Sequence, residues 1–350
     1  MSCLAALSPF AEFAVFSGVK ILCVFAVMMF IVAYAVWVER KVCAAIQDRI
    51  GPNRAGPFGL LQPAADAVKS FFKEDFTPAH VRKAYFWLAP AIVMIPPLMT
   101  IAIIPFGSQI RGEPMVIADL NVGILYTFGI VSLSVYGIVL AGYAANSKYP
   151  FLGGIRSSAQ MISYEISMGM SVIPIFLIVG GLNLSQLIGW QAQHGWLLLY
   201  APLSFAIFLA AMFAETNRLP FDLPESEQEL AGGYNVEYSS IKFALFFMGE
   251  YAAMTAASAM LVTLFLGGWT LPFAGLDQPA TTLGIGVAQI GIFLAKMCVV
   301  EFMVIWVRWM WPRFRYDQLM DLGWRRFIPL ALANIVVTAI VLALKARGGQ

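Results

Sequence analysis

Eight long apolar stretches dominate this chain and limit what it can fold into. A helix that crosses a lipid bilayer needs about 20 apolar residues. The 350 residues are 60% hydrophobic and 12% charged, and a soluble domain has about twice that charged share. We therefore expect an all-α polytopic membrane protein that forms a single domain over residues 1–350. The eight expected spans are about 18–38, 85–106, 121–145, 158–180, 196–214, 243–266, 282–308 and 327–345.

Residues 57–73 predict a helix of a different kind. Leu61, Val68 and Phe72 fall on one face of this helix, whereas Asp66 and Lys69 fall on another. This spacing is typical of an amphipathic helix that lies in the plane of the membrane interface. The preceding segment is rich in Gly and Pro and is expected to be a loop.

Lysine and arginine residues gather in the connections on one side of the expected bundle. The first connection, residues 39–84, alone carries eight of them, whereas the connections on the other side carry only Arg111. Because such residues stay on the cytoplasmic side, we expect both termini to be periplasmic. The expected location is the bacterial inner membrane, with the mitochondrial inner membrane as the alternative. The net charge of +2 gives no indication of a nucleic-acid partner.

Seven of the twenty carboxylates fall within 36 residues, 215–250. Like charges at this density cannot all ionise freely, so their titrations are expected to be coupled. A solvated acidic loop is the alternative, but Phe221 and Leu223 favour a folded and partly buried segment over 215–241. The stretch therefore suggests proton handling at a membrane surface. Its acids are Glu215, Asp222, Glu225, Glu227, Glu229, Glu237 and Glu250.

Two glutamates fall inside expected spans. Glu165 and Glu250 each lie about seven residues from the cytoplasmic end of a span, or about 10 Å deep at 1.5 Å per residue. An ionisable residue at such a position faces protein or water. Each is either a proton site or a structural partner of an arginine on a neighbouring helix. Lys296 and Glu301 are five residues apart, so a bridge between them is not expected.

Glu39, Arg40 and Lys41 close the first span. They are either a stop-transfer anchor or a polar rim where an amphiphile enters between this span and the interfacial helix. In the second case Arg40, Arg49 and Asp66 would line its path.

The four cysteines and two histidines form no cluster of the kind that binds haem or an iron–sulfur centre. We therefore expect no metal cofactor in this chain, and if the chain takes part in redox chemistry, the electrons come from a partner.

Three long motifs resemble a known family. They are ERK…QDRIGPNRAGPFGLLQPAADAVKSFFKED, YPFLGGIRSSAQMISYEISMG and ETNRLPFDLPESEQELAGGYNVEYSSIKFALFFMGEY. They resemble the membrane subunit of the proton-pumping NADH:quinone oxidoreductase, respiratory complex I, whose mitochondrial counterpart is NADH dehydrogenase subunit 1. The resemblance extends over nearly the whole chain.

The resemblance implies a role in a translocase. Such a subunit forms a quinone chamber with two peripheral-arm subunits and contacts small membrane-arm subunits and lipid. Quinone, for example ubiquinone, is the substrate, while FMN and iron–sulfur clusters belong to partner subunits, so no catalytic residue is expected here. The implied quinone-binding positions are Glu39, Arg40, Arg49, Asp66, Phe247 and Met248. The implied proton path comprises Glu165, Glu215, Glu225, Glu227, Glu229, Glu237 and Glu250.

Other functions stay open at this point. One is the homologous membrane subunit of a membrane-bound hydrogenase or of a related dehydrogenase. Another is a stand-alone proton-coupled transporter, although transporters usually contain internal repeats and this chain shows none. A purely structural anchor would not need glutamates inside its spans.

Overall fold

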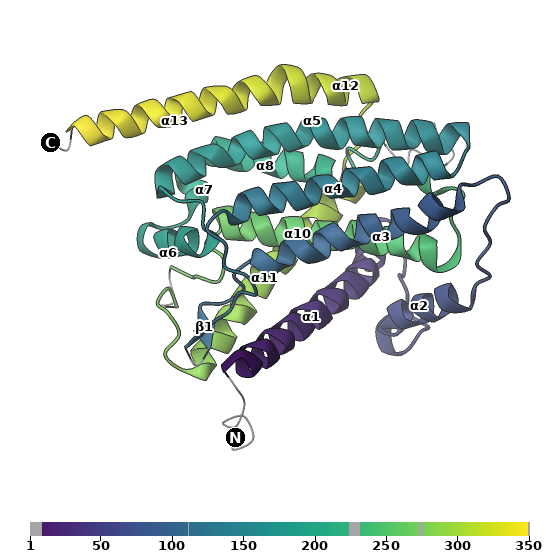
Figure 1. Cartoon of the computed structure of the whole chain (residues 1–350), viewed down its shortest axis with the longest axis horizontal. Coiled ribbons are helices and arrows are strands. Elements are labelled where there is room, and N and C mark those ends of the chain that lie inside the picture. Colours follow the sequence, from purple (N-terminus) through teal and green to yellow (C-terminus); the bar gives the residue numbers. More distant parts are fainter. Residues whose placement is uncertain (1–8, 111, 224–231, 273–275, 349–350) are drawn as a thin grey trace.

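The computed structural model describes residues 9–110, 112–223, 232–272 and 276–348 and shows a bundle of long helices (Figure 1). In this part of the chain, seven helices are long and apolar enough to cross a membrane, and α8 is a shorter apolar helix. The expected all-α polytopic fold is thereby confirmed. The helices are α1 (Pro9–Ile46), α2 (Gln62–Phe72), α3 (Lys83–Thr100), α4 (Gly123–Ala144), α5 (Lys148–Val179), α6 (Leu184–His194), α7 (Leu197–Tyr200), α8 (Pro202–Glu215), α10 (Ser240–Phe265), α11 (Leu283–Met310), α12 (Tyr316–Asp321) and α13 (Ile328–Gly348). Strands β1 (Gln109–Ile110) and β2 (Glu113–Pro114) pair antiparallel.

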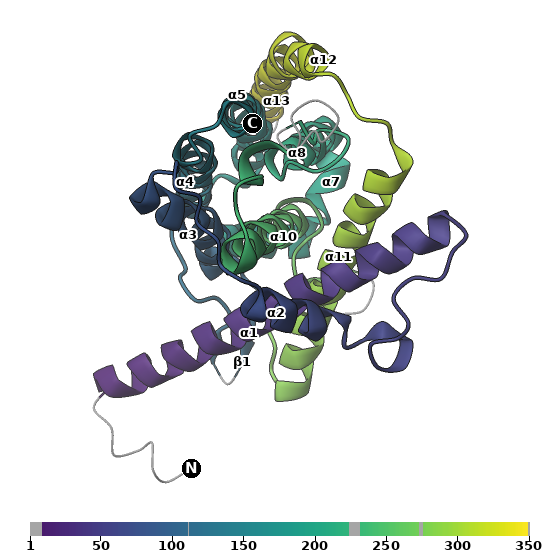
Figure 2. The ribbon, with the colours of Figure 1, turned by 90° about the vertical axis from the view of Figure 1, so that its right-hand side faces the viewer.

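Helix α10 is the central element of the bundle. Figure 2 shows it with α3, α4, α5, α8 and α11 arranged around it. In the apolar stretch of α10, 67% of the residues are buried, against 17% in α1 and 6% in the last helix. A side chain on α10 can therefore contact most of the other helices.

Helices α3 and α4 pack closely because of one glycine. A Cβ atom on Gly137 of α4 would lie 2.6 Å from a methyl group of Val93 on α3. Helix α3 also contains Pro90, Pro96 and Pro97, which remove backbone donors and bend helices. Near the end of this helix, Thr100 Oγ1 donates to the Pro96 carbonyl at 3.0 Å.

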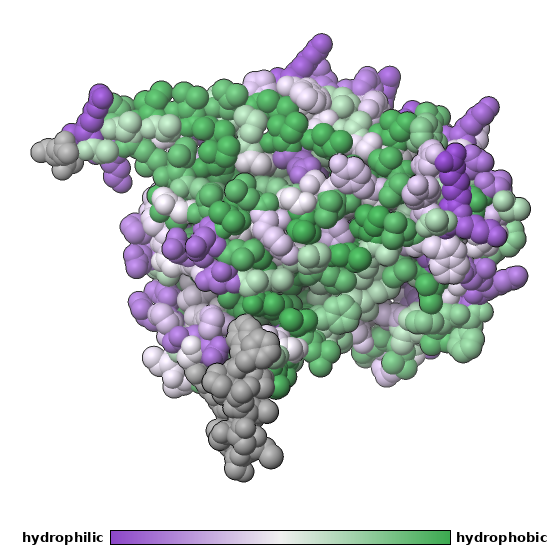
Figure 3. Space-filling view, in the orientation of Figure 1, coloured by the Kyte–Doolittle hydropathy of each residue, from purple (hydrophilic) through white to green (hydrophobic). Residues whose placement is uncertain are grey.

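The outer surface of the bundle fits a lipid environment. Figure 3 shows a broad hydrophobic surface along the helices, with hydrophilic side chains gathered toward the two ends. On α1, Leu22 is 68% exposed, and on the last helix Leu344 is 62% exposed. Apolar side chains at such positions are stable against lipid and unfavourable in water.

The observed elements differ from the expected ones at several places. The expected span 18–38 lies within a longer helix, since α1 extends from Pro9 to Ile46. The expected connection before residue 196 contains α6, which is capped by Asn183 through hydrogen bonds from the Ser185 and Gln186 amides at 2.7 and 3.0 Å. The expected span 196–214 divides at Ala201, because Pro202 starts a new helix. The expected span 158–180 starts earlier, since α5 begins at Lys148. The interfacial helix expected over 57–73 is α2, while residues 57–59 form a separate 3₁₀ turn.

Candidate functional site

A buried ion cluster lies where α1, α10 and α11 meet the loop after α8. At its centre, the Glu39 carboxylate is 5% exposed. Arg218 Nη1 donates to Glu39 Oε2 at 3.1 Å, and Arg308 Nη1 donates to Oε1 at 2.6 Å. The Tyr251 hydroxyl also donates to Oε2, at 2.8 Å. Glu39 therefore has two cationic partners and a hydroxyl donor, and three distant parts of the chain meet on it.

Arg218 joins Glu39 to Glu250. Its Nε lies 2.8 Å from Glu250 Oε1, and its guanidinium carbon lies 4.1 Å from the centre of the Tyr251 ring. The side chain is almost completely buried. Burial opposes its charge, but Glu250, Tyr251 and Glu39 outweigh this effect and raise the pKa of Arg218 above its usual range. Arg218 is therefore a fixed positive charge between two carboxylates. Glu250 thus has the arginine partner considered from the sequence, supplied by a loop and not by a neighbouring helix.

The loop after α8 is folded down onto the bundle. Phe221 and Leu223 are 5% and 1% exposed, which confirms the expectation of a partly buried segment for this part of the loop. Between them, Asp222 Oδ2 accepts a hydrogen bond from Arg313 Nη2 at 3.0 Å. Burial raises the pKa of Asp222 to about 6, although Arg313 opposes the shift. Asp222 therefore changes its charge close to neutral pH.

A cavity of about 80 Å³ lies between α3, α4, α5, α8 and α10. Glu215 and Glu250 line it together with mostly apolar side chains, among them Met161, Met212 and Met260. Glu215 is buried, and neither of its carboxylate oxygens has a hydrogen-bond partner among the described residues. A buried polar group of this kind requires a partner. The cavity has room for several water molecules that could supply one.

Helix α5 fixes the position of Glu215. Gln160 Nε2 donates to the Ala214 carbonyl at 2.8 Å and to the Phe221 carbonyl at 2.7 Å. It thereby ties the end of α8 and the following loop to α5. Glu165, five residues further along α5, is half-buried and close enough to Glu215 for their charges to interact.

An ion pair connects α1 with the amphipathic helix α2. Arg40 Nη1 lies 2.8 Å from Asp66 Oδ2, and both side chains are partly exposed. Gln62 Nε2 also donates to Asp66 Oδ1, at 3.0 Å. Arg49, in contrast, bonds to the Gln47 side chain at 2.7 Å beside the end of α1.

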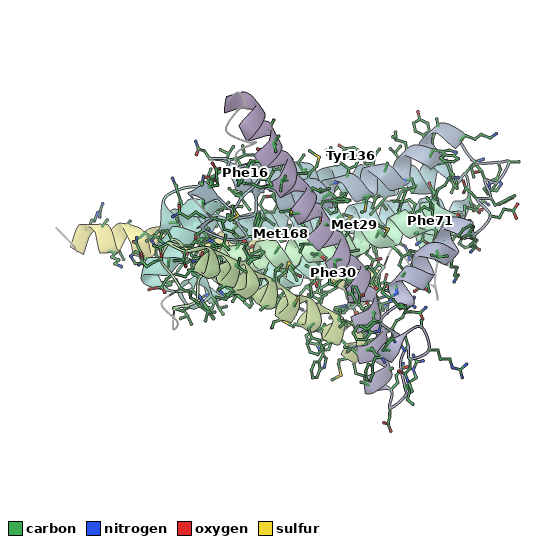
Figure 4. The ribbon with its side chains drawn as sticks, turned by 90° about the horizontal axis from the view of Figure 1, so that it is seen from below. Phe16, Met29, Phe30, Phe71, Tyr136 and Met168 are labelled. Atoms are coloured by element: carbon green, nitrogen blue, oxygen red, sulfur yellow. The ribbon has the colours of Figure 1, made fainter. Side chains whose placement is uncertain are left out.

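Exposed apolar side chains lie on the two helices that bear this ion pair and on α10. Figure 4 shows α1 crossing the bundle with Met29 and Phe30 on its middle part, and Phe71 on α2. Phe71 is 70% exposed, and Phe247 on α10 is 37% exposed. Met248, next to Phe247, is half-buried. An apolar surface of this composition suits the tail of an amphiphile.

The structure brings some of the expected site residues together and separates others. Glu39 and Glu250 share Arg218, Glu165 interacts with Glu215, and Arg40 pairs with Asp66. Glu237 is separate from these groups, with its Oε2 at 3.9 Å from His80 Nε2. Glu225, Glu227 and Glu229 lie outside the described residues.

The cationic members of the cluster were not expected as site residues. Arg218, Arg308 and Arg313 belong to the basic residues from which the orientation was predicted and entered no other argument, and Tyr251 entered none. The positions of the three arginines at or just beyond the ends of expected spans carried a usable signal, because carboxylates inside a membrane protein need cationic partners. Among the described residues, no group of three or more His, Cys, Asp or Glu side chains could hold a metal ion.

Comparisons with known proteins identify the family. A family model described as NADH dehydrogenase matches residues 19–339. This chain belongs to the NADH dehydrogenase family. An NADH-quinone oxidoreductase subunit of Cytophaga hutchinsonii is 45% identical over 340 residues, which cover 95% of this chain and 98% of that protein. NADH-quinone oxidoreductase subunit 8 of Rhodothermus marinus is 48% identical over 327 residues (91% and 94%), and subunit 8 of the Thermus thermophilus enzyme is 50% identical over 315 residues (89% and 83%). The family expected from the motifs is confirmed.

Proposed function

We propose that this chain is the membrane subunit of an NADH:quinone oxidoreductase that forms part of the quinone chamber and couples quinone reduction to proton translocation. The names of its relatives support this assignment. One observation carries the mechanistic part. A single buried ion cluster, Glu39–Arg218–Glu250, extends from the helix that bears Arg40 to the cavity that contains Glu215.

The proposed division of labour follows from the chemistry of this chain. FMN and iron–sulfur clusters in partner subunits would deliver electrons, and reduction of a quinone to a quinol consumes protons as well. The Arg40–Asp66 pair and the apolar surface around it would admit the quinone between α1, α2 and α10. The fixed charge of Arg218 would link Glu39 and Glu250 electrostatically. A change of charge in the chamber would then alter the Arg218–Glu250 contact at the wall of the cavity.

Proton movement is assigned to the cavity and its carboxylates. Water in the cavity would connect Glu250 with Glu215, whose carboxylate has no other partner among the described residues. Glu165 would exchange a proton with Glu215. The proposed proton path comprises Glu165, Glu215, Glu225, Glu227, Glu229, Glu237 and Glu250. The proposed quinone-binding residues are Glu39, Arg40, Arg49, Asp66, Phe247 and Met248.

The proposed setting is a bacterial inner membrane. Seven long apolar helices in the described part and the family membership support a multi-pass location. The positions of lysine and arginine support periplasmic termini and a cytoplasmic ion cluster. Partners would be the peripheral-arm subunits around the quinone chamber and the small membrane-arm subunits beside it.

Affinity purification of the tagged chain from gently solubilised membranes tests the assignment. The expected result is co-purification of flavin and iron–sulfur subunits, with NADH-driven quinone reduction in the same fraction. The untagged strain, processed identically, is the control. Nickel–iron hydrogenase subunits in the purified fraction would contradict the assignment and favour the sister enzymes. A lone chain under conditions that keep other membrane complexes intact would favour a transporter.

A further inference from the structure

The first turn of α10 holds the end of α2. The Ser240 hydroxyl lies 2.9 Å from the Ser70 carbonyl and 2.9 Å from the Lys73 carbonyl. Ser70 lies in the last turn of α2 and Lys73 directly follows it, where carbonyls have no partner within the helix. Ser240 has a φ of 56°, a left-handed conformation that a non-glycine residue rarely adopts. This backbone conformation lets the hydroxyl cap a different helix.

Lys242 holds the segment that follows α2. It is 3% exposed, and its Nζ lies 3.0 Å from Asp75 Oδ1 and 3.0 Å from Thr77 Oγ1. The same ammonium group lies 3.7 Å from the centre of the Trp87 ring on α3. Such a contact is attractive when the cation is removed from water. The segment after α2 is therefore fastened to both α10 and α3.

Helix α2 itself lies on the surface, and the ion pair that joins it to α1 is more exposed than Lys242. No residue between Gln62 and Phe72 is buried. Among the ion pairs of the described residues, Arg40–Asp66 joins α2 to α1, and its side chains are 46% and 34% exposed. Solvent-exposed ion pairs contribute little to stability. If α2 is displaced, the ion pair with α1 is therefore expected to break before the contacts with α10.

We infer that Lys242 is a positioning residue for quinone access, which together with Ser240 anchors α2 so that the opening widens only between α1 and α2. This inference rests on the proposed function, because it assumes that quinone passes beside α2. The anchored end also contacts the acidic loop. Ser239 Oγ donates to the Glu74 carbonyl at 3.4 Å, and the Tyr238 ring stacks on Phe86 at 4.0 Å. The position of α2 and the end of the loop are thereby linked.

Quinones with tails of different length provide the test. The tail of a long-chain quinone still occupies the opening when its head group is bound, whereas a short-chain analogue lies wholly inside. In the assembled complex, Lys242→Met should raise KM for a long-tailed quinone about fourfold to fifteenfold, the size expected when tail contacts equivalent to one or two methylene groups are lost. KM for the short-tailed analogue and kcat should stay within about twofold of the parent values, and Lys242→Arg should restore most of the loss.

Lys20→Met is the matched control. Lys20 also makes an ion pair, with Glu113 at 3.8 Å, and a carbonyl hydrogen bond, to Pro114 at 2.8 Å. It lies nineteen residues before Glu39 on the same helix, a distance of about 28 Å at 1.5 Å per residue. This variant should leave both KM values unchanged.

Three outcomes distinguish the possibilities. Equal KM values for parent and Lys242→Met with both quinones would overturn the anchor while leaving the proposed function intact. An Arg40→Ala variant without any change in quinone dependence would instead contradict the proposed access route. If Lys242→Met does not assemble, Thr77→Val removes one contact of Lys242 with little change in shape, and an unchanged long-tail KM in that variant would equally overturn the anchor.

Discussion

Replacement of Arg218 by glutamine should destabilise the assembled protein more than any exposed arginine replacement. Arg218 neutralises two carboxylates at once. After its removal, Glu39 keeps Arg308 at 2.6 Å and the Tyr251 hydroxyl at 2.8 Å. Glu250 keeps no cation within ion-pair distance in the part of the chain that the structure describes. The loss therefore falls mainly on Glu250.

The expected loss of stability follows from this difference between Glu39, which keeps a cationic partner, and Glu250, which does not. Removal of one partner from a buried ion pair costs about 3–5 kcal/mol, which is roughly a hundredfold or more in the folding equilibrium. Arg218 is nearly fully buried, so solvent does not reduce this figure. The double variant Arg218→Gln/Glu250→Gln removes the uncompensated charge as well. It should therefore be more stable than Arg218→Gln alone, although it contains one more substitution.

Two measurements test the destabilisation by Arg218→Gln and its relief in the double variant. They are the amount of assembled complex after native electrophoresis and the half-life of that complex at raised temperature. Arg325→Gln is the matched control, since Arg325 is 82% exposed and pairs only with Asp321 on its own helix, at 3.0 Å, among the described residues. If Arg218→Gln were as stable as this control, the stabilising role of the buried cluster would be refuted. A double variant no more stable than Arg218→Gln would refute the assignment of the cost to Glu250.

Three further predictions concern the other parts of the site. Glu215→Gln should assemble but lower coupled proton pumping in proteoliposomes by tenfold or more, since removal of a proton-transfer group typically costs about 10²–10⁴-fold; normal pumping would remove Glu215 from the path. Arg40→Ala should raise KM for quinone by roughly fivefold with normal assembly, and a selective loss of assembly would point to a structural role instead. The raised pKa of Asp222, about 6, implies a stability contribution that is full below the unfolded pKa of about 3.9 and is lost as pH rises through about 6. The half-life of Asp222→Asn relative to the parent should therefore increase between about pH 4 and 6, and a constant ratio across that window would contradict the shift.

The sequence predicted the helices well where one physical requirement dominates. An apolar run of span length must form a helix in lipid, because no water satisfies its backbone groups there. The same run does not show where a helix divides or extends. Ala201 and Pro202 interrupt the fifth expected span, and Lys148 starts α5 well before its apolar part. Such boundaries depend on local capping and tertiary contacts that hydropathy does not contain.

The candidate site was predictable in its carboxylates and not in its cations. Glu165 and Glu250 stand out because a charge inside an apolar run is rare and costly. Arg218 and Arg308 lie among the many basic residues at helix ends, and each is consistent with a simple interface anchor. Both arginines pair with Glu39 because α1, α10 and α11 meet the loop after α8 at one place. One sequence without its relatives gives no information on which helix ends meet.

Helix α10 connects the proposed access route with the ion cluster, and this connection can be measured. Lys242 and Glu250 lie eight residues apart on one buried helix, or about 12 Å at 1.5 Å per residue. Substitutions at that separation normally combine additively, within about 0.5 kcal/mol or roughly twofold. A rigid, centrally packed helix transmits a displacement at one site to the other. The double variant Lys242→Met/Glu250→Gln should therefore change the long-tail KM by a factor that differs from the product of the single effects by more than about threefold. Simple multiplication of the two effects would show that access and charge changes are independent, and α10 would then be a passive support.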